Sequence, residues 1–209
     1  MAGCSSNVVL DPPTIPKPLV KQIPLSIALR MPENFEQFVH EENVLGREEW
    51  KIDLGRSNAV FFEQLMSYMF ANVTIIQADA DPTGMPFDAL IEPTIDAFEF
   101  SVPNQTKTDA FAVWIRYRVK VFGPNGKLVV NWPVSAYGKS LTTAMGGSEA
   151  LQRAAVLAMR DAAALLILKF NEKTIAGALA GTGNIDVGAG DDGTNTAASA
   201  SIAAGGNDE

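Results

Sequence analysis

Two alternating segments between residues 111 and 136 constrain the fold of this chain more than any other feature. Polar and apolar side chains alternate from Phe111 to Phe122, and they alternate again from Leu128 to Ala136. A period of two is typical of a β-strand with one buried and one exposed face. The sequence Gly-Pro-Asn-Gly at 123–126 supplies a turn between the segments. Together they predict a long antiparallel hairpin.

Two segments have the spacing of amphipathic helices. The first follows Gly55, and its apolar side chains recur from Val60 to Met69, with Ser57 as the expected N-terminal cap. The second opens at 146–148 and carries alanines at helical spacing, which predicts close packing on a sheet.

Shorter segments complete the expected fold. Strands are predicted at 24–31, 50–54 and 73–76, and after a Pro/Gly-rich turn at 89–91 and 94–102, where Pro93 places the second of these two segments at an edge or a bulge. The Glu-rich stretch 33–49 is predicted to be an irregular or short helical insertion. The expected class is α+β: a mainly antiparallel sheet of about four to six strands, with two helices packed on one face.

Composition divides the chain into three parts. Residues 1–23 hold a proline-rich stretch typical of an extended tether. Residues 24–176 contain the predicted strands and helices. Residues 177–209 are mostly small and polar, which predicts a disordered low-complexity tail.

The single cysteine, Cys4, lies in the sequence Ala2-Gly3-Cys4-Ser5. This resembles the end of a bacterial lipoprotein signal, in which the cysteine is acylated and becomes the mature N-terminus. The resemblance implies a palmitate-bearing lipid anchor, with Ser5 directing the protein to the outer membrane. Because the usual upstream segment is missing, we expect the sequence to begin at a trimmed or misassigned start. The alternative is an exposed thiol that follows small residues by chance.

Charge and hydropathy exclude other classes. The formal net charge of -8 argues against a nucleic-acid surface, which needs an excess of Lys and Arg. No apolar run approaches the roughly 20 residues of a membrane-spanning helix. One cysteine excludes an internal disulfide and zinc motifs built on paired cysteines.

Several motifs suggest catalysis or metal binding, but the sequence around each of them argues against that function. The glycine pattern at 188–193 and the calcium-repeat-like stretch at 181–186 lie in the predicted tail. The loop from Asp79 resembles an EF-hand start, but Leu90 occupies the position of the required Glu. His40 is the only histidine, stands among acids, and is expected on a solvated helix surface. No catalytic residue, metal site or cofactor is predicted, and the protein is expected not to be an enzyme.

One constellation has binding chemistry. The polar face of the predicted hairpin carries three cations flanked by two aromatics: Trp114, Arg116, Arg118, Lys120 and Phe122. Such a row can bind phosphates or acidic sugars through charge-assisted hydrogen bonds, and its aromatics can stack on rings or on a partner protein. The alternative is an ordinary exposed sheet face lined by long cations.

The order of elements behind the lipidation sequence resembles small bacterial outer-membrane lipoproteins. These are the lipopolysaccharide-assembly lipoprotein and the exopolysaccharide-export ring lipoproteins, and the likeness of layout covers about residues 24–171. It implies a noncatalytic scaffold or assembly factor of the cell envelope, facing the periplasm. The implied partners are the membrane, through the lipid anchor, and envelope proteins or a second copy of the chain. A binding module for an acidic glycan or lipid head group, and an enzyme of unrecognised type, stay open as alternatives.

Overall fold

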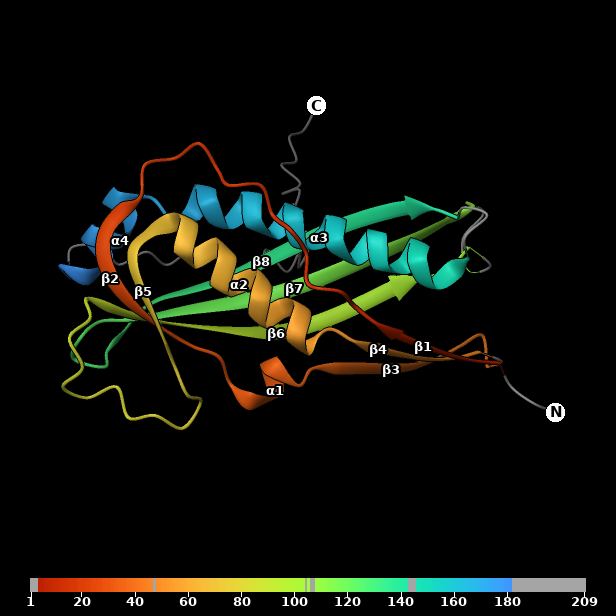
Figure 1. Ribbon diagram of the computed structural model, residues 1–209, viewed down its shortest axis with the longest axis horizontal. Coiled ribbons are helices and arrows are strands. Elements are labelled where there is room, and N and C mark those ends of the chain that lie inside the picture. Colours follow the sequence, from red (N-terminus) through yellow and green to blue (C-terminus); the bar gives the residue numbers. More distant parts are fainter. Residues whose placement is uncertain (1–3, 47, 104, 106–107, 143–145, 182–209) are drawn as a thin grey trace, which may run out of the picture.

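The computed structural model describes residues 4–46, 48–103, 105, 108–142 and 146–181 (Figure 1). Eight strands and four helices are present in this part of the chain. The strands are β1 Cys4–Val9, β2 Ile23–Arg30, β3 Val39–Val44, β4 Glu48–Asp53, β5 Phe70–Ile76, β6 Ala89–Ser101, β7 Ala110–Phe122 and β8 Leu128–Leu141. The helices are α1 Glu33–Glu36, α2 Gly55–Met69, α3 Gly147–Lys169 and α4 Glu172–Leu179.

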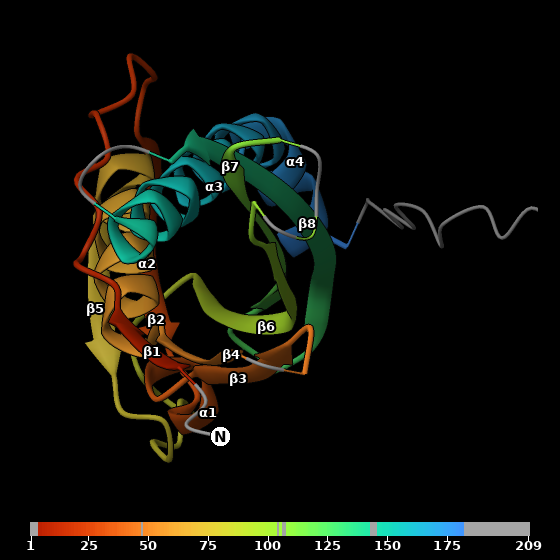
Figure 2. The same cartoon turned by 90° about the vertical axis from the view of Figure 1, so that its right-hand side faces the viewer.

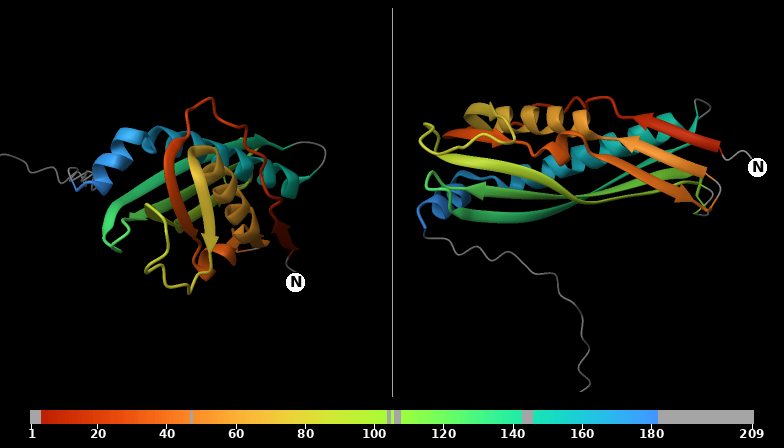
Figure 3. Two further views of the ribbon diagram at one scale, coloured as in Figure 1. Left: turned by 60° about the vertical axis from the view of Figure 1, so that its left-hand side comes forward. Right: turned by 90° about the horizontal axis from the view of Figure 1, so that it is seen from below.

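The larger sheet has the strand order β5-β2-β6-β7-β8. The predicted hairpin is confirmed: β7 pairs antiparallel with β8, and β6 pairs antiparallel with β7. However, β2 runs parallel to both β5 and β6, so the sheet is mixed rather than mainly antiparallel. The strands β2 and β5 lie side by side in the left view of Figure 3. A parallel pair needs a long crossover, and the segment that includes α2 provides it here.

A second, three-stranded sheet has the order β1-β4-β3. In it β1 runs parallel to β4, and β3 runs antiparallel to β4. The Glu-rich stretch therefore contains the short helix α1, as predicted, but also a strand that the sequence did not suggest. Acidic residues fit this strand because one of its faces is exposed to solvent.

The proline-rich segment is not a free tether. Its first residues form β1, and the apolar side chains of Val8, Leu10 and Ile15 are buried in the core. The Ser57 hydroxyl donates to the Leu10 carbonyl at 2.5 Å, and the Arg160 guanidinium donates to the Thr14 carbonyl at 3.2 Å. The segment expected to be a tether is therefore bound to the domain by apolar side chains, two before the first proline and one between prolines.

Helices α2 and α3 cover the same face of the larger sheet (Figure 1). From α2, Phe61 and Phe62 pack on Tyr117 of β7, with ring centroids 6.0 and 5.4 Å away. The Tyr117 hydroxyl is buried and donates to the Asn58 side-chain oxygen at 2.7 Å. Burial raises the pKa of this hydroxyl, which stays protonated.

The N-terminus of α2 differs from the prediction. The helix begins at Gly55 with Leu54 as its cap residue, and Ser57 is buried inside the helix. Its hydroxyl does not cap the helix, because it bonds the Leu10 carbonyl of the N-terminal segment instead. The prediction that Ser57 caps this helix is therefore wrong.

Helix α3 approaches β8 closely, as its small residues predict. Its buried face includes Ala154, Ala158 and Ala162. A Cβ atom added at Gly138 of β8 would lie 2.0 Å from the Ala154 carbonyl oxygen. Helix and strand backbones therefore touch at this glycine.

The C-terminal boundary also shifts. Helix α4 includes residue 177, where the tail was predicted to begin, and its Ile175 and Ala178 side chains are buried. The Asn171 side chain accepts from the Thr174 amide at 2.9 Å and caps this helix. The glycine pattern at 188–193 and nearly all of the calcium-repeat-like stretch lie outside the described residues.

Candidate functional site

The face of β6, β7 and β8 that points away from α2 and α3 is named here the open sheet face. Viewed along the molecule, β7 and β8 lie on the side opposite to α2 (Figure 2). The alternation of β7 buries Val113, Ile115 and Tyr117 beneath the helices and turns the intervening side chains outward. All five predicted binding residues belong to this outward set: Trp114, Arg116, Arg118, Lys120 and Phe122.

Two of the three cations are ion-paired with acids of neighbouring strands. The Arg118 guanidinium donates to both Asp96 carboxylate oxygens, at 3.0 and 2.5 Å, and this contact raises the pKa of Arg118. The Lys120 ammonium lies 3.9 Å from a Glu92 carboxylate oxygen, and Arg30 of β2 lies 2.9 Å from the other. These pairs leave Arg116 as the one cation of the predicted row without an acidic partner among the described residues.

The acids of β6 could not be paired with these cations from the sequence. Asp96 stands 22 residues before Arg118, and it lies at a register shift between Ile95 and Ala97. The bulge turns the Asp96 carboxylate toward Arg118, although Thr94 is the residue directly opposite. The available signal was three acids, at 92, 96 and 99, within one predicted strand region.

At the opposite end of the cationic row, which begins at Trp114, the side chains are exposed to solvent. The Trp114 and Tyr137 rings contact each other with centroids 5.1 Å apart, and each residue is 43% exposed. Arg116, the next outward residue of β7, is exposed, and its guanidinium has no hydrogen bond or ion pair with any residue that the structure describes. Two aromatic rings and a guanidinium are thus available here, and we name these three residues the aromatic patch.

Phe122 does not join the aromatic patch. It lies eight residues further along β7, which corresponds to about 27 Å of strand. There it lines a 250 Å³ pocket together with Arg30, Phe87, Leu90 and the β7–β8 turn. Pro82, Thr83 and Phe87 of the β5–β6 connection line the same pocket, so Phe122 belongs to a different part of the surface.

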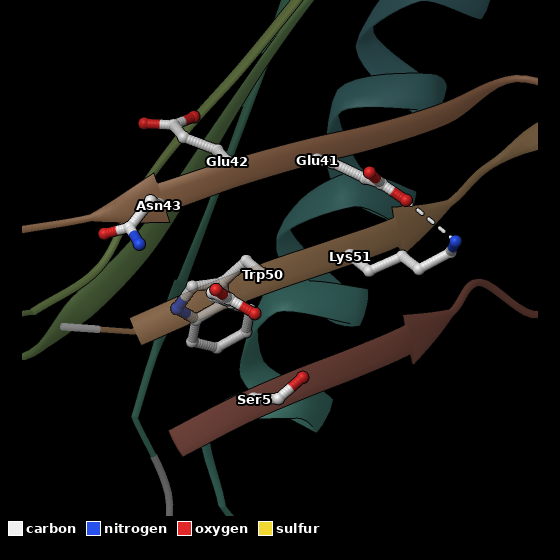
Figure 4. A pocket seen from close by; sticks show the side chains of 7 residues that line it. Ser5, Glu41, Glu42, Asn43, Trp50 and Lys51 are labelled. Carbon is white, nitrogen blue, oxygen red and sulfur yellow. Dashed lines mark hydrogen bonds and ion pairs between the residues drawn. The ribbon is translucent and has the colours of Figure 1, made fainter. Parts of the chain in front are cut away.

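A second candidate lies on the outer face of the smaller sheet (Figure 4). This open pocket of 410 Å³ is lined by Ser5, Glu41, Glu42, Asn43, Glu49, Trp50 and Lys51. The Lys51 ammonium lies 2.7 Å from a Glu41 carboxylate oxygen, and it lowers the pKa of Glu41. Among the described residues, no group of three or more His, Cys, Asp or Glu could hold a metal ion.

His40 lies on strand β3 and not on a helix surface, which corrects the prediction. Its imidazole Nε2 is 3.0 Å from a Glu42 carboxylate oxygen. Its ring packs against Phe98 and Phe100, with centroids 5.0 and 5.9 Å away. The ring thus contributes to the contact between the two sheets.

Cys4 is the first residue of β1 and lies opposite Glu48 in the parallel ladder. The acylation site expected from the sequence is therefore part of the folded domain. No helix within the described ranges combines the length and hydropathy needed to cross a membrane.

Comparisons with known proteins identify no family. No protein-family profile and no curated protein matches the chain. Similar solved structures include a homolog of a neuraminyllactose-binding hemagglutinin from Helicobacter pylori, with TM-score 0.45, 8% identity and coverage of 82% of this chain and 98% of that one. A protein described as a lipoprotein from Caulobacter crescentus has TM-score 0.39, 12% identity and coverage of 56% and 79%. Lipoprotein GNA1162 from Neisseria meningitidis has TM-score 0.31, 13% identity and coverage of 61% and 90%. Similarities this distant assign no role to the chain.

Proposed function

We propose that this chain is a noncatalytic lipoprotein of the bacterial cell envelope, and that it acts as a scaffold or assembly factor. The observation that carries the proposal is the aromatic patch on the open sheet face. Trp114, Tyr137 and Arg116 are the residue types that contribute most to protein–protein interfaces, because they bury large areas and bond through a polar end. No described helix or strand covers them.

The ion pairs beside the aromatic patch support the same function. The Arg118–Asp96 pair is bidentate and bridges β6 and β7, so it holds that part of the face in a fixed shape. A polar rim beside exposed aromatic rings is the usual anatomy of a specific protein interface. The partner is an envelope protein or a second copy of this chain.

The lipid anchor is supported by Ala2-Gly3-Cys4-Ser5. We expect acylation of Cys4 and, from Ser5, placement in the outer membrane facing the periplasm. Full-length chain carrying Cys4→Ala should leave the membrane fraction, whereas Ser6→Ala, a control close to the cysteine, should stay. Mass spectrometry of the N-terminal peptide measures the modification directly. Native protein without an acyl mass would overturn this part of the proposal.

The interface is tested by the double variant Trp114→Ser/Arg116→Ser. Both side chains are exposed, so its urea midpoint should stay close to that of the parent. Native electrophoresis of envelope extracts from the host measures the size of the assembly that contains the protein. The assembly seen with the parent should be lost with the double variant. Lys127→Ser removes an exposed cation of the β7–β8 turn and is the matched control. A double variant that folds and assembles like the parent would place the interface elsewhere.

One observation favours a second function, a binding module for an acidic glycan or a lipid head group. Arg116 is without a carboxylate partner among the described residues, and two rings that could stack on a sugar lie beside it. In that case purified protein should bind an anionic oligosaccharide with an affinity that falls as salt rises. Arg116→Ser should abolish this binding and Lys127→Ser should not.

A further inference from the structure

Several chain segments meet at the end of the molecule where β1 begins. Figure 1 shows there the β3–β4 turn, the end of β8 and the start of α3. Residues of these segments line one shared cavity of 580 Å³, among them Ser6, Glu48, Asp109, Thr142, Gly147 and Ser148. We name this region the Cys4 end.

Leu45 has an unusual conformation at this end. It lies in the β3–β4 turn with φ of 55°, and it is the one non-glycine residue with positive φ among those described. Gly or Asn is the ordinary choice for this left-handed conformation, because a Cβ atom is crowded there. The Leu45 side chain is also 61% exposed, so burial does not explain a leucine here.

A second exposed leucine lies at the same end. Leu141 is the last residue of β8, opposite Ala110, and is 66% exposed. Scattered exposed apolar residues are normal on a protein surface. Leu45 and Leu141 differ from the others because they share one end with the proposed anchor.

We infer that the Cys4 end rests on the membrane surface, with Leu45 and Leu141 inserted among the lipids. This inference rests on the proposed acylation of Cys4. Because Cys4 is already paired with β4, no flexible chain separates an acyl group on this residue from the domain. The acyl chains would hold the Cys4 end at the level of the head groups, where exposed leucines gain from leaving water.

Charge decides which lipid surface fits. Glu48 and Asp109 line the cavity at this end, whereas Glu149 at the start of α3 lies 3.9 Å from the Arg153 guanidinium and is compensated by it. The carboxylates of Glu48 and Asp109 would be repelled by anionic head groups. The surface that fits is therefore zwitterionic phospholipid such as phosphatidylethanolamine.

The test supplies the anchor chemically, so that it does not depend on acylation in cells. Cys4 is the only thiol of the chain, and the full-length unacylated protein can be coupled through it to a maleimide lipid. The vesicles contain phosphatidylcholine and phosphatidylethanolamine, with or without brominated acyl chains. Leu45→Trp and Leu141→Trp report insertion, and Leu168→Trp is the control. Leu168 is 75% exposed at the C-terminal end of α3, far from the Cys4 end (Figure 1).

After the parent signal is subtracted, brominated lipid should quench the added tryptophan at 45 and at 141 at least twofold more than that at 168. Equal quenching at the three positions would overturn the inference and leave the lipoprotein proposal intact. Hydrogen exchange of the coupled parent provides a second measurement without any substitution. Amides of the β3–β4 turn should exchange at least threefold more slowly on vesicles, whereas those of α4 should not change. Unchanged exchange in the turn would also overturn the inference.

Discussion

At position 138 only a glycine fits, because helix α3 leaves no space for a Cβ atom. Gly138 lies on the buried face of β8, opposite Val113, where α3 passes over the strand. The nearest helix atoms are backbone atoms of Ala154 and Ala158, which cannot rotate away as a side chain can. Any side chain at 138 must therefore push the whole helix from the sheet.

Gly138→Ala is expected to lower the free energy of unfolding by about 3 kcal/mol, at the upper end of overpacking effects, because the clash is with backbone. Urea denaturation followed by circular dichroism measures the change. Ser135→Ala, on the exposed face of the same strand, should stay within about 0.5 kcal/mol of the parent. Equal midpoints for the two variants would show that α3 does not pack on β8 at this distance.

Strand β1 shows at the element scale how a proline-rich segment becomes part of a sheet. Within it the buried and exposed positions alternate, and Val8 faces the core whereas Val9 is 62% exposed. The backbone of both residues is paired with β4, so the difference between them lies in the side chain.

This alternation gives a direct test of the N-terminal segment. Val8→Asp should lower the free energy of unfolding by about 3 kcal/mol or more, because a carboxylate would enter the apolar core. Val9→Asp should change it by less than about 0.5 kcal/mol. Thermal melts of the two variants provide the comparison. A free tether would give two equal and small effects.

The sequence alone predicts elements whose signal is local. The hairpin and both long helices could be predicted because alternation, turn residues and helical spacing are all contained in short windows. The pairing of β1 with β4, and of β2 with β5 and β6, could not be predicted, because parallel pairing depends on chain crossovers and not on composition. The same limit applies to the site: the outward residues of β7 were predictable, but their acidic partners on β6 depend on register.

At the scale of the whole molecule, the two sheets share one core. Trp50 of the smaller sheet packs on Phe100 and Phe111 of the larger sheet, with ring centroids 5.6 and 6.0 Å apart. Each of the eight strands contributes at least one buried residue to the same cluster as the buried residues of α2 and α3. Neither sheet has a separate core on which it could remain folded alone.

The protein should therefore unfold in one cooperative transition. Far-ultraviolet circular dichroism and tryptophan fluorescence should report the same urea midpoint. Trp50→Ala should lower the free energy of unfolding by about 3 to 5 kcal/mol without splitting the transition. Two separate midpoints, in the parent or in the variant, would mean that the sheets fold as independent units.

The parallel pairing of β1 with β4 also has a consequence for the order of folding. If the chain is exported from its N-terminus, β1 emerges first, whereas its partner strand β4 follows only after β2, α1 and β3. The β7–β8 hairpin closes a short turn and can form without waiting for distant partners. Strand β1 must instead close a long loop, which costs more entropy. If the chain is anchored at Cys4, β1 is thus the segment that reaches the membrane first and one of the last to pair with its partner strand.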